Sequence, residues 1–291
     1  MKQVKRIYII KNIVILTSMI LLSELTIGSN TRKEFSPEIG ICVDFSKAGI
    51  LSENGYTFVE EFVRSFLVPD KSEEEFNKIL ANAKQSPLPV IACNSFLPHS
   101  MKSVGAKAAH AKILKFAETA FRRAQKAGVK IIVFGSGGSR KIPDGFPREK
   151  ARKQFIGLCS KMAPIAAKYD VTIVLEPLNT NVCNFINSIA EGGEIVKEVN
   201  HPNFRLLADL YHMKIDGEGP EGILKYGHLI KHIHLSEKEG QAAPGTHGED
   251  FRPYFEALKK VGYQGPISIE CKWEDFNSQV VTAIQAIKKQ L

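Results

Sequence analysis

Short runs of Val, Ile and Leu alternate along the chain with longer segments in which apolar residues recur at the spacing of a helix. The apolar runs carry few charged residues, which is typical of strands that are buried on both faces of a parallel sheet. We expect eight such strands, at residues 39–45, 56–63, 88–96, 129–137, 171–179, 204–213, 230–237 and 266–273.

Helices are expected between these runs. Ser72 and Glu75 have the spacing of a capping box at the start of one helical segment, and Gly128 stands as a stop signal at the end of another. The expected helices lie at residues 72–85, 106–128, 147–169, 187–199, 250–262 and 276–290.

Eight strands joined by helical crossovers predict an α/β protein with one domain, a (β/α)8 TIM barrel over residues 39–291. The alternative architecture is a doubly wound open sheet, but the glycine-rich dinucleotide fingerprint is missing after the first expected strand. In a barrel, the active residues come from the C-terminal ends of the strands and from the loops that follow them.

The first 28 residues differ from the rest of the chain. Basic residues, including Lys2 and Lys11, precede the apolar run 13–22, and the small residues Gly28 and Ser29 follow it. This order is the layout of a secretory signal peptide, and the alternative is an uncleaved N-terminal membrane anchor. We therefore expect residues 1–28 to be a signal peptide or anchor, residues 29–38 to be a linker, and the barrel to be exported, to the periplasm or outside the cell.

The charge bears on whether the protein binds nucleic acid, and the number of cysteines bears on whether it contains disulfides. The formal net charge is +8, but residues 1–28 hold four basic side chains and one acidic side chain, so that the remainder carries +5. No dense basic run follows the leader, which argues against a nucleic-acid partner. The five cysteines are an odd number and three fall in expected strands, so no disulfide framework is predicted.

Four side chains at or near the ends of four different strands carry the candidate chemistry. They are Glu176, Asp209, His234 and Glu270. If the strands lie side by side in a barrel, these side chains converge at one end of it. Three carboxylates in one pocket repel each other strongly unless a divalent cation lies among them. The sequence therefore predicts a metal-dependent active site.

Further polar and aromatic residues near the expected strand ends are candidate substrate contacts. The segment FGSGGSR contains Gly135, Gly137 and Gly138, and we interpret it as a loop that brings the backbone close to a substrate; an anion cradle is the alternative. Arg140 follows in the same loop. Asn179, His99 and Trp273 are further candidates, the last as an apolar wall for a sugar ring.

The succession IVLEPLN, LLADLYHM, HIHLSE, APGTHGEDF and GYQGPISIE resembles the xylose isomerase-like superfamily of sugar phosphate isomerases and epimerases, over about residues 39–290. The resemblance implies that the four residues named above bind one divalent metal, commonly manganese, magnesium or cobalt, with zinc also open. It further implies that His212, three residues after Asp209, binds substrate.

Two positions depart from the pattern of the epimerases in that family. Those enzymes usually carry a second glutamate six residues after the first, where this chain has Val182, and an arginine six residues after the metal histidine, where it has Gly240. The loss of a carboxylate and a guanidinium changes which hydroxyl groups of a sugar can be satisfied. The resemblance therefore indicates the metal site more firmly than the substrate.

The chemistry that these residues suit is removal of a proton from a carbon beside a carbonyl, with a cation stabilising the enediolate oxygen. Glu176 and Glu270 are the expected catalytic pair, one removing the proton and the other returning it. Asp209 and His234 are expected mainly to hold the metal. We expect His232 to point away from the face that carries His234 and to be structural.

The predicted function is a metal-dependent sugar isomerase or epimerase with a small carbohydrate as its substrate. The alternatives are a lyase or dehydratase acting on a keto-sugar or inosose, and a sugar-binding barrel without catalysis. A nuclease of the endonuclease IV type is disfavoured, because it needs further histidines on the early strands, where this chain has FGSGG.

Export favours a free sugar, keto-sugar or glycoside over a phosphorylated sugar. No membrane contact of the barrel itself is expected, and association into a homo-oligomer through outer helices stays open.

Overall fold

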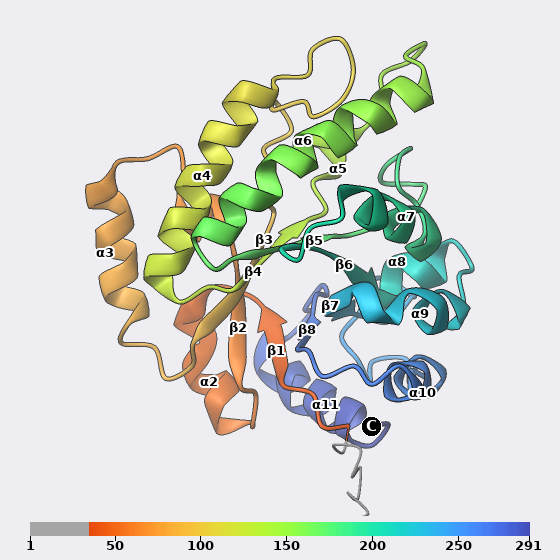
Figure 1. Cartoon of the computed structure of the whole chain (residues 1–291). Helices are drawn as coiled ribbons and strands as arrows, with labels where there is room; N and C mark the ends of the chain where they lie inside the picture. The colour runs from red at the N-terminus through yellow and green to blue at the C-terminus, as the bar shows by residue number, and fades with distance from the viewer. Residues whose placement is uncertain (1–34) are drawn as a thin grey trace, which may run out of the picture. The chain divides into compact units, whose positions relative to one another are not determined.

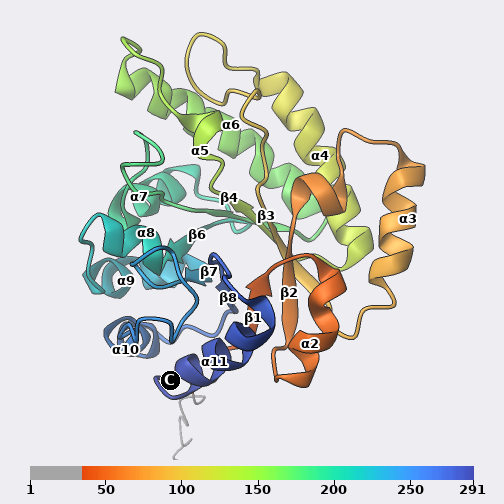
Figure 2. The ribbon, with the colours of Figure 1, turned by 180° about the vertical axis from the view of Figure 1, so that it is seen from behind.

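Eight parallel strands close into a barrel in the computed structural model, which describes residues 35–291. The strands follow one another around the barrel in chain order, and β1 (Ile39–Cys42) pairs with β8 (Ile267–Ile269) to close it. Helices surround the strands (Figures 1 and 2). The predicted (β/α)8 TIM barrel is confirmed. The expected signal or anchor segment at residues 1–28, and most of the linker at 29–38, lie outside the described residues.

All eight strands were predicted, but each is shorter than its apolar run. The six between β1 and β8 are β2 (Phe58–Phe62), β3 (Val90–Asn94), β4 (Ile131–Phe134), β5 (Thr172–Leu175), β6 (Phe204–Asp209) and β7 (Ile230–Leu235). Glu176 and Glu270 each follow directly after a strand, and their amides still donate to the neighbouring strand, to the Phe134 carbonyl at 3.3 Å and the Leu235 carbonyl at 3.1 Å. The expected strand 204–213 was too long, since residues 210–213 already belong to a helix.

Each of the six expected helices is present within its predicted range. They are α3 (Glu73–Ala83), α4 (His110–Ala127), α6 (Arg148–Lys168), α7 (Ile189–Val199), α10 (Arg252–Lys260) and α11 (Phe276–Lys288). The short helices were not predicted: α2 (Ala48–Glu53), α5 (Gly137–Arg140), α8 (Leu210–Ile215), α9 (Glu221–Tyr226) and the turns η1 (Phe45–Lys47), η2 (Val63–Leu67) and η3 (Gly227–Leu229). The supposed loop FGSGGSR therefore contains a helical turn.

The predicted start and stop signals act as expected. The Ser72 hydroxyl accepts a hydrogen bond from the Glu75 amide at 3.1 Å, and the Glu75 carboxylate accepts one from the Ser72 amide at 3.2 Å. Gly128 follows α4 with a φ of 83°, a left-handed conformation that glycine adopts without strain. These local signals fix where α3 begins and where α4 ends.

The apolar core lies mainly between the barrel and its helices. A row of aromatic rings joins the end of β4 to α6: Phe134 packs on Phe96 with ring centroids 5.6 Å apart and on Phe155 at 5.2 Å. Phe155 in turn contacts Phe185 at 5.7 Å. This packing holds β4, and the chain that follows it, in place at the mouth of the barrel.

The barrel interior is less apolar than the outer core. Val133, Val174 and Leu207 form a small separate cluster of buried residues. Polar side chains are buried as well, among them Glu60, His232 and Ser268, each fully shielded from solvent. The interior therefore holds polar groups that must form hydrogen bonds with one another.

Within residues 35–291, every helix is too short or too polar to cross a lipid bilayer.

Candidate metal centre and active site

The structure brings together Glu176, Asp209, His234 and Glu270 at the C-terminal ends of four consecutive strands, β5 to β8. One donor atom from each side chain lies within 4.8 Å of the donor atoms of the other three. His234 Nδ1 is 3.2 Å from a Glu176 oxygen and 3.0 Å from a Glu270 oxygen. The convergence expected from the parallel strands is therefore present in the folded chain.

The charge of this cluster suits a divalent cation. Glu176 and Asp209 are only 6% and 3% exposed, and His234 is fully buried, whereas the Glu270 side chain is 32% exposed. In the part of the chain that the structure describes, none of the three carboxylates has a Lys or Arg partner within 4.0 Å. Carboxylate oxygens with one imidazole nitrogen are a donor set for manganese, magnesium, cobalt or zinc. The residues present therefore fit a single divalent metal.

Glu60 on β2 supports the cluster from inside the barrel, and it was not predicted. One of its oxygens accepts a hydrogen bond from His234 Nε2 at 2.9 Å. The other oxygen lies 2.6 Å from His232 Nε2 and 2.6 Å from the Ser268 hydroxyl. With Nε2–H bound to Glu60, His234 directs Nδ1 towards Glu176 and Glu270, which is the usual arrangement of a metal-binding histidine and its carboxylate partner.

The electrostatics of this buried group follow from its contacts. Burial by itself would raise the pKa of Glu60, but the adjoining His234 and His232 lower it well below its usual range. Burial by itself would lower the pKa of His234, but Glu60, Cys42 and Glu270 raise it overall. Glu60 is therefore a buried carboxylate held in its charged form by two imidazoles.

The prediction that His232 points away from His234 was wrong. Side chains two residues apart on a strand lie on the same face, so both histidines enter the barrel and both contact Glu60. The sequence did hold a signal for Glu60: the pair Glu60 and Glu61 interrupts an apolar strand. In such a pair, one carboxylate must face the barrel interior.

We predict that Glu60→Gln weakens metal binding with little change in the fold. The amide keeps the volume of the carboxylate, but it cannot accept hydrogen bonds from both histidines. Loss of such a supporting contact lowers metal affinity by roughly 10- to 100-fold. The affinity is measured by competition with a chelator of known strength.

Glu61→Gln is the matched control for this prediction. Glu61 accepts hydrogen bonds from the backbone amides of Phe45 at 2.6 Å and Phe62 at 3.1 Å, one on each oxygen, so the substitution removes one backbone contact but none with His232 or His234. The control is expected to bind metal as the wild type does. Equal affinities in Glu60→Gln and Glu61→Gln would show that Glu60 does not position the metal ligand.

His212 and Asn179 form a hydrogen-bonded pair beside Asp209. The Asn179 amide donates to His212 Nδ1 at 2.7 Å, which leaves the proton of a neutral His212 on Nε2, 3.8 Å from an Asp209 oxygen. Asp209 also caps α8, because its other oxygen accepts hydrogen bonds from the amides of Tyr211 at 2.8 Å and His212 at 3.2 Å. Asn179 is 2% exposed, so its contact with His212 fixes the orientation of that ring.

A cavity of about 320 Å³ opens beside the metal cluster. Glu176 and Glu270 both line it, and so do Arg64, Asn94 and His99. Among these five, Arg64 and Asn94 were not predicted. Asn94 donates to a Glu270 oxygen at 3.1 Å, while its own buried Oδ1 has no partner. Asn94 therefore orients one carboxylate of the cluster.

The glycines after β4 allow close packing at this cavity. A Cβ on Gly135 would overlap Glu176 Oε2, and a Cβ on Gly138 would overlap the His99 ring. Both side chains therefore lie directly on bare backbone. This close approach is the reason that the segment needs glycine, and it involves two of the predicted site residues.

We predict that Gly135→Ala displaces the Glu176 carboxylate and lowers metal affinity and turnover by at least about tenfold, since supporting contacts of this kind typically contribute that much. Gly157→Ala is the matched control, because nothing lies within 4 Å of the added Cβ on that helical residue. The control should bind metal normally. Normal metal binding by Gly135→Ala as well would show that the loop adapts to the added methyl group.

Two of the predicted substrate contacts lie elsewhere. Arg140 is fully buried and donates to the backbone carbonyls of Phe134 at 3.3 Å and Ile186 at 3.5 Å, so its assignment as a substrate contact was wrong. A guanidinium in a loop can turn inwards to satisfy carbonyl groups, and the sequence gives no sign of the direction. Trp273 packs edge-on against Phe276 at 5.2 Å and does not line the 320 Å³ cavity. His99 does line it.

Comparisons with known proteins agree with this geometry. A family model described as "Xylose isomerase-like TIM barrel" matches residues 49–290. L-ribulose 3-epimerase from Methylomonas sp. is 34% identical over 142 residues, 48% of this chain and 48% of the relative. The chain thus spans about half the length of the curated relatives that it matches.

Solved structures show the same fold at lower identity. The 3-keto-D-glucoside 4-epimerase from E. coli superposes with a TM-score of 0.75 at 19% identity, covering 87% of this chain and 100% of that one. The IOLI protein with a bound zinc atom gives a TM-score of 0.67 at 19% identity, covering 87% and 96%. At 19% identity, this likeness shows a shared fold and nothing about activity.

Proposed function

Because the chain belongs to the xylose isomerase-like TIM barrel family, we propose that it is a divalent-metal-dependent sugar isomerase or epimerase. The observation that supports this most is the cluster of four donor atoms within 4.8 Å of one another, two of whose carboxylates open into a cavity. The relatives named as sugar epimerases support the same class of reaction. The proposed substrate is a small carbohydrate with a carbonyl group.

The proposed reaction begins with removal of a proton from the carbon beside that carbonyl. A divalent cation held by the cluster would supply stabilisation for the negative charge that develops on the enediolate oxygen. Glu176 and Glu270 both line the cavity, and in the proposed reaction one removes the proton while the other returns it. Return to the opposite face inverts the carbon, whereas transfer within one face moves the carbonyl.

The remaining residues orient the reactants. Asn94 holds one Glu270 oxygen and leaves the other free to face His234 and the substrate. His212 donates from Nε2 to the reacting oxygen, and Asn179 fixes that orientation by donating to Nδ1. Asp209 and His234 mainly hold the cation.

A lyase or dehydratase that acts on a keto-sugar is the second candidate, because it shares the first proton transfer. Two departures from the epimerase pattern favour this second candidate. Val182 is 49% exposed at the position where the family's epimerases usually carry a substrate-binding glutamate, and Gly240 stands in place of an arginine. Without these two groups, the hydroxyls of a ketose that an epimerase holds would lack their partners.

Solvent-deuterium exchange tests the proposed function. The full-length protein is incubated in D₂O with manganese, or with EDTA, against free ketoses, aldoses and 3-keto-glucosides, and the sugars are analysed by NMR after metal and protein are removed. Manganese-dependent deuterium uptake beside a carbonyl is expected, and the product separates an isomerase from a lyase. Metal-loaded protein that exchanges no proton in any of these sugars would contradict the proposal.

A further inference from the structure

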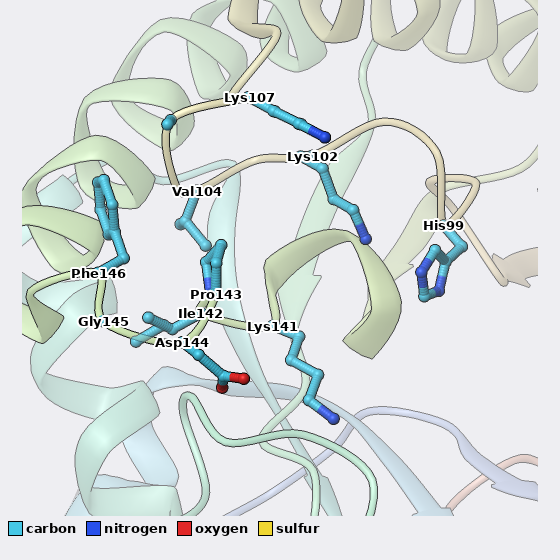
Figure 3. Close-up of a pocket in the computed structure, with 11 residues that line it drawn as sticks. His99, Lys102, Val104, Lys107, Lys141, Ile142, Pro143, Asp144, Gly145 and Phe146 are labelled. Carbon is cyan, nitrogen blue, oxygen red and sulfur yellow. The ribbon is translucent and has the colours of Figure 1, made fainter.

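A second and larger cavity adjoins the one at the metal cluster. It measures about 570 Å³ and lies between the loop after β3 and the segment after α5 (Figure 3). His99 lines both cavities, so they meet at this side chain. A substituent on a sugar in the 320 Å³ cavity would therefore find a second space on the other side of His99.

The lining of the second cavity is strongly basic. Three lysines line it, Lys102, Lys107 and Lys141, against one acidic residue, Asp144. Among the described residues, none of the three ammonium groups has a carboxylate within 4.0 Å. Unpaired like charges around one cavity repel each other and attract an anion.

The basic groups lie next to an apolar wall. The apolar lining comes from Val104, Ile142, Pro143 and Phe146. Figure 3 shows Phe146, Val104 and Pro143 on one side of the cavity, and the ends of Lys102 and Lys141 on the side nearer His99. A ligand that fits both parts has a ring with an apolar face and carries a negative charge.

The walls of this cavity are tied to the barrel mouth. Lys102 donates to the carbonyl of Gly138 at 2.8 Å, next to the point where the His99 ring packs on the same glycine. The Ser103 amide donates to the Ser139 carbonyl at 3.0 Å. Asn184 pairs with both backbone groups of Ile142, at 2.9 and 3.0 Å. The backbone that forms the cavity is therefore tied to the barrel mouth, and Lys102 is held at a fixed place beside Gly138.

We propose that this cavity is a subsite for an anionic, ring-bearing substituent of the substrate, so that the substrate is an acidic glycoside whose reacting sugar lies at the metal cluster. The inference rests on the proposed function for the place of the reacting sugar. The negative charge is that of a carboxylate, as in a uronic acid residue, or of a sulfate or phosphate ester. His99 lies at the junction between the reacting sugar and the substituent.

Binding of matched glucosides tests the subsite without turnover. The probes are 4-nitrophenyl, 4-carboxyphenyl and 4-sulfophenyl β-D-glucopyranoside, which have a similar size but a neutral, carboxylate or sulfonate aglycone. Binding to the full-length protein with magnesium is measured by calorimetry at low salt. The anionic glucosides are expected to bind at least about threefold more tightly than the neutral one, and salt should reduce the difference.

The double variant Lys107→Gln/Lys141→Gln should remove this preference while it leaves the affinity for the neutral glucoside unchanged. The matched control is Lys84→Gln/Lys168→Gln, which removes the same charge from exposed lysines that line neither cavity. The control should keep the preference. Tighter binding of the carboxylate than of the sulfonate would favour a uronic acid as the substituent, and the reverse order would favour a sulfate or phosphate ester.

Three results would overturn the subsite: no binding of any probe, equal binding of the anionic and neutral probes, or a preference that the lysine variant retains. Its failure is distinct from failure of the proposed function. Deuterium exchange without an anion preference would remove the subsite alone. A lysine-dependent preference without exchange would support the subsite and count against the isomerase chemistry.

Discussion

Glu176→Gln and Glu270→Gln are each expected to abolish deuterium exchange with the fold intact. Glutamine keeps the shape of the side chain but removes the carboxylate that accepts or returns the proton. General acid–base catalysis alone contributes roughly 10²- to 10⁴-fold to a rate, and both residues also belong to the metal cluster. A fall of at least about 10³-fold in exchange rate is therefore expected for each variant.

The difference in burial between the two glutamates separates their roles. Glu176 is 6% exposed and packs on Gly135, whereas the Glu270 side chain is 32% exposed at the cavity. We expect Glu176→Gln to lose more bound metal than Glu270→Gln, as measured by metal analysis of the same samples. Exposed Glu274→Gln, four residues after Glu270, is the control and should behave as the wild type does. Exchange near the wild-type rate in both site variants would remove both residues from the mechanism.

The residues of the metal cluster could be predicted because, in a barrel, the place of a residue along a strand determines where its side chain lies. Parallel strands place their C-terminal ends on one rim, so that an ionisable residue at the end of an apolar run has a defined location. Glu176, Asp209, His234 and Glu270 all had this signature. The strand and helix order followed from apolar periodicity in the same way, although the strand ends did not, since the apolar runs continue beyond the residues that pair in the sheet.

Contacts inside the barrel could not be derived by the same argument. Glu60 lies in the middle of an early strand and meets His234 across 174 residues of sequence, and only the closed barrel brings them together. The direction of the Arg140 side chain could not be predicted either, because the short helix α5 that carries it was not predicted, and this helix turns the guanidinium towards carbonyl groups and away from the cavity. The second cavity is likewise built by loops whose course depends on hydrogen bonds between distant residues, such as Ile142 with Asn184.

Asp209 takes part in a helix cap and in the candidate metal cluster, and its variants should separate these two roles. One oxygen caps α8 through the amides of Tyr211 and His212, and the carboxylate also belongs to the metal cluster. Asp209→Asn keeps an acceptor for the cap but removes a charge from the cluster. Asp209→Ala removes both, and loss of a cap costs about 1 kcal/mol of folding free energy.

Asp209→Asn is therefore expected to lose most of its bound metal while the metal-free protein melts at or above the wild-type temperature, because one repelling carboxylate is gone. A ligand that binds only the folded state raises the melting temperature, so the rise that manganese gives the wild type should largely vanish in this variant. Asp209→Ala should show the same loss of metal and, without metal, a lower melting temperature than Asp209→Asn, because it also lacks the cap. Ser188→Ala, which removes the cap of α7 alone, is the control and should lower the melting temperature but keep the response to manganese. An unchanged metal content in both Asp209 variants would show that the cluster holds its cation with the other three side chains.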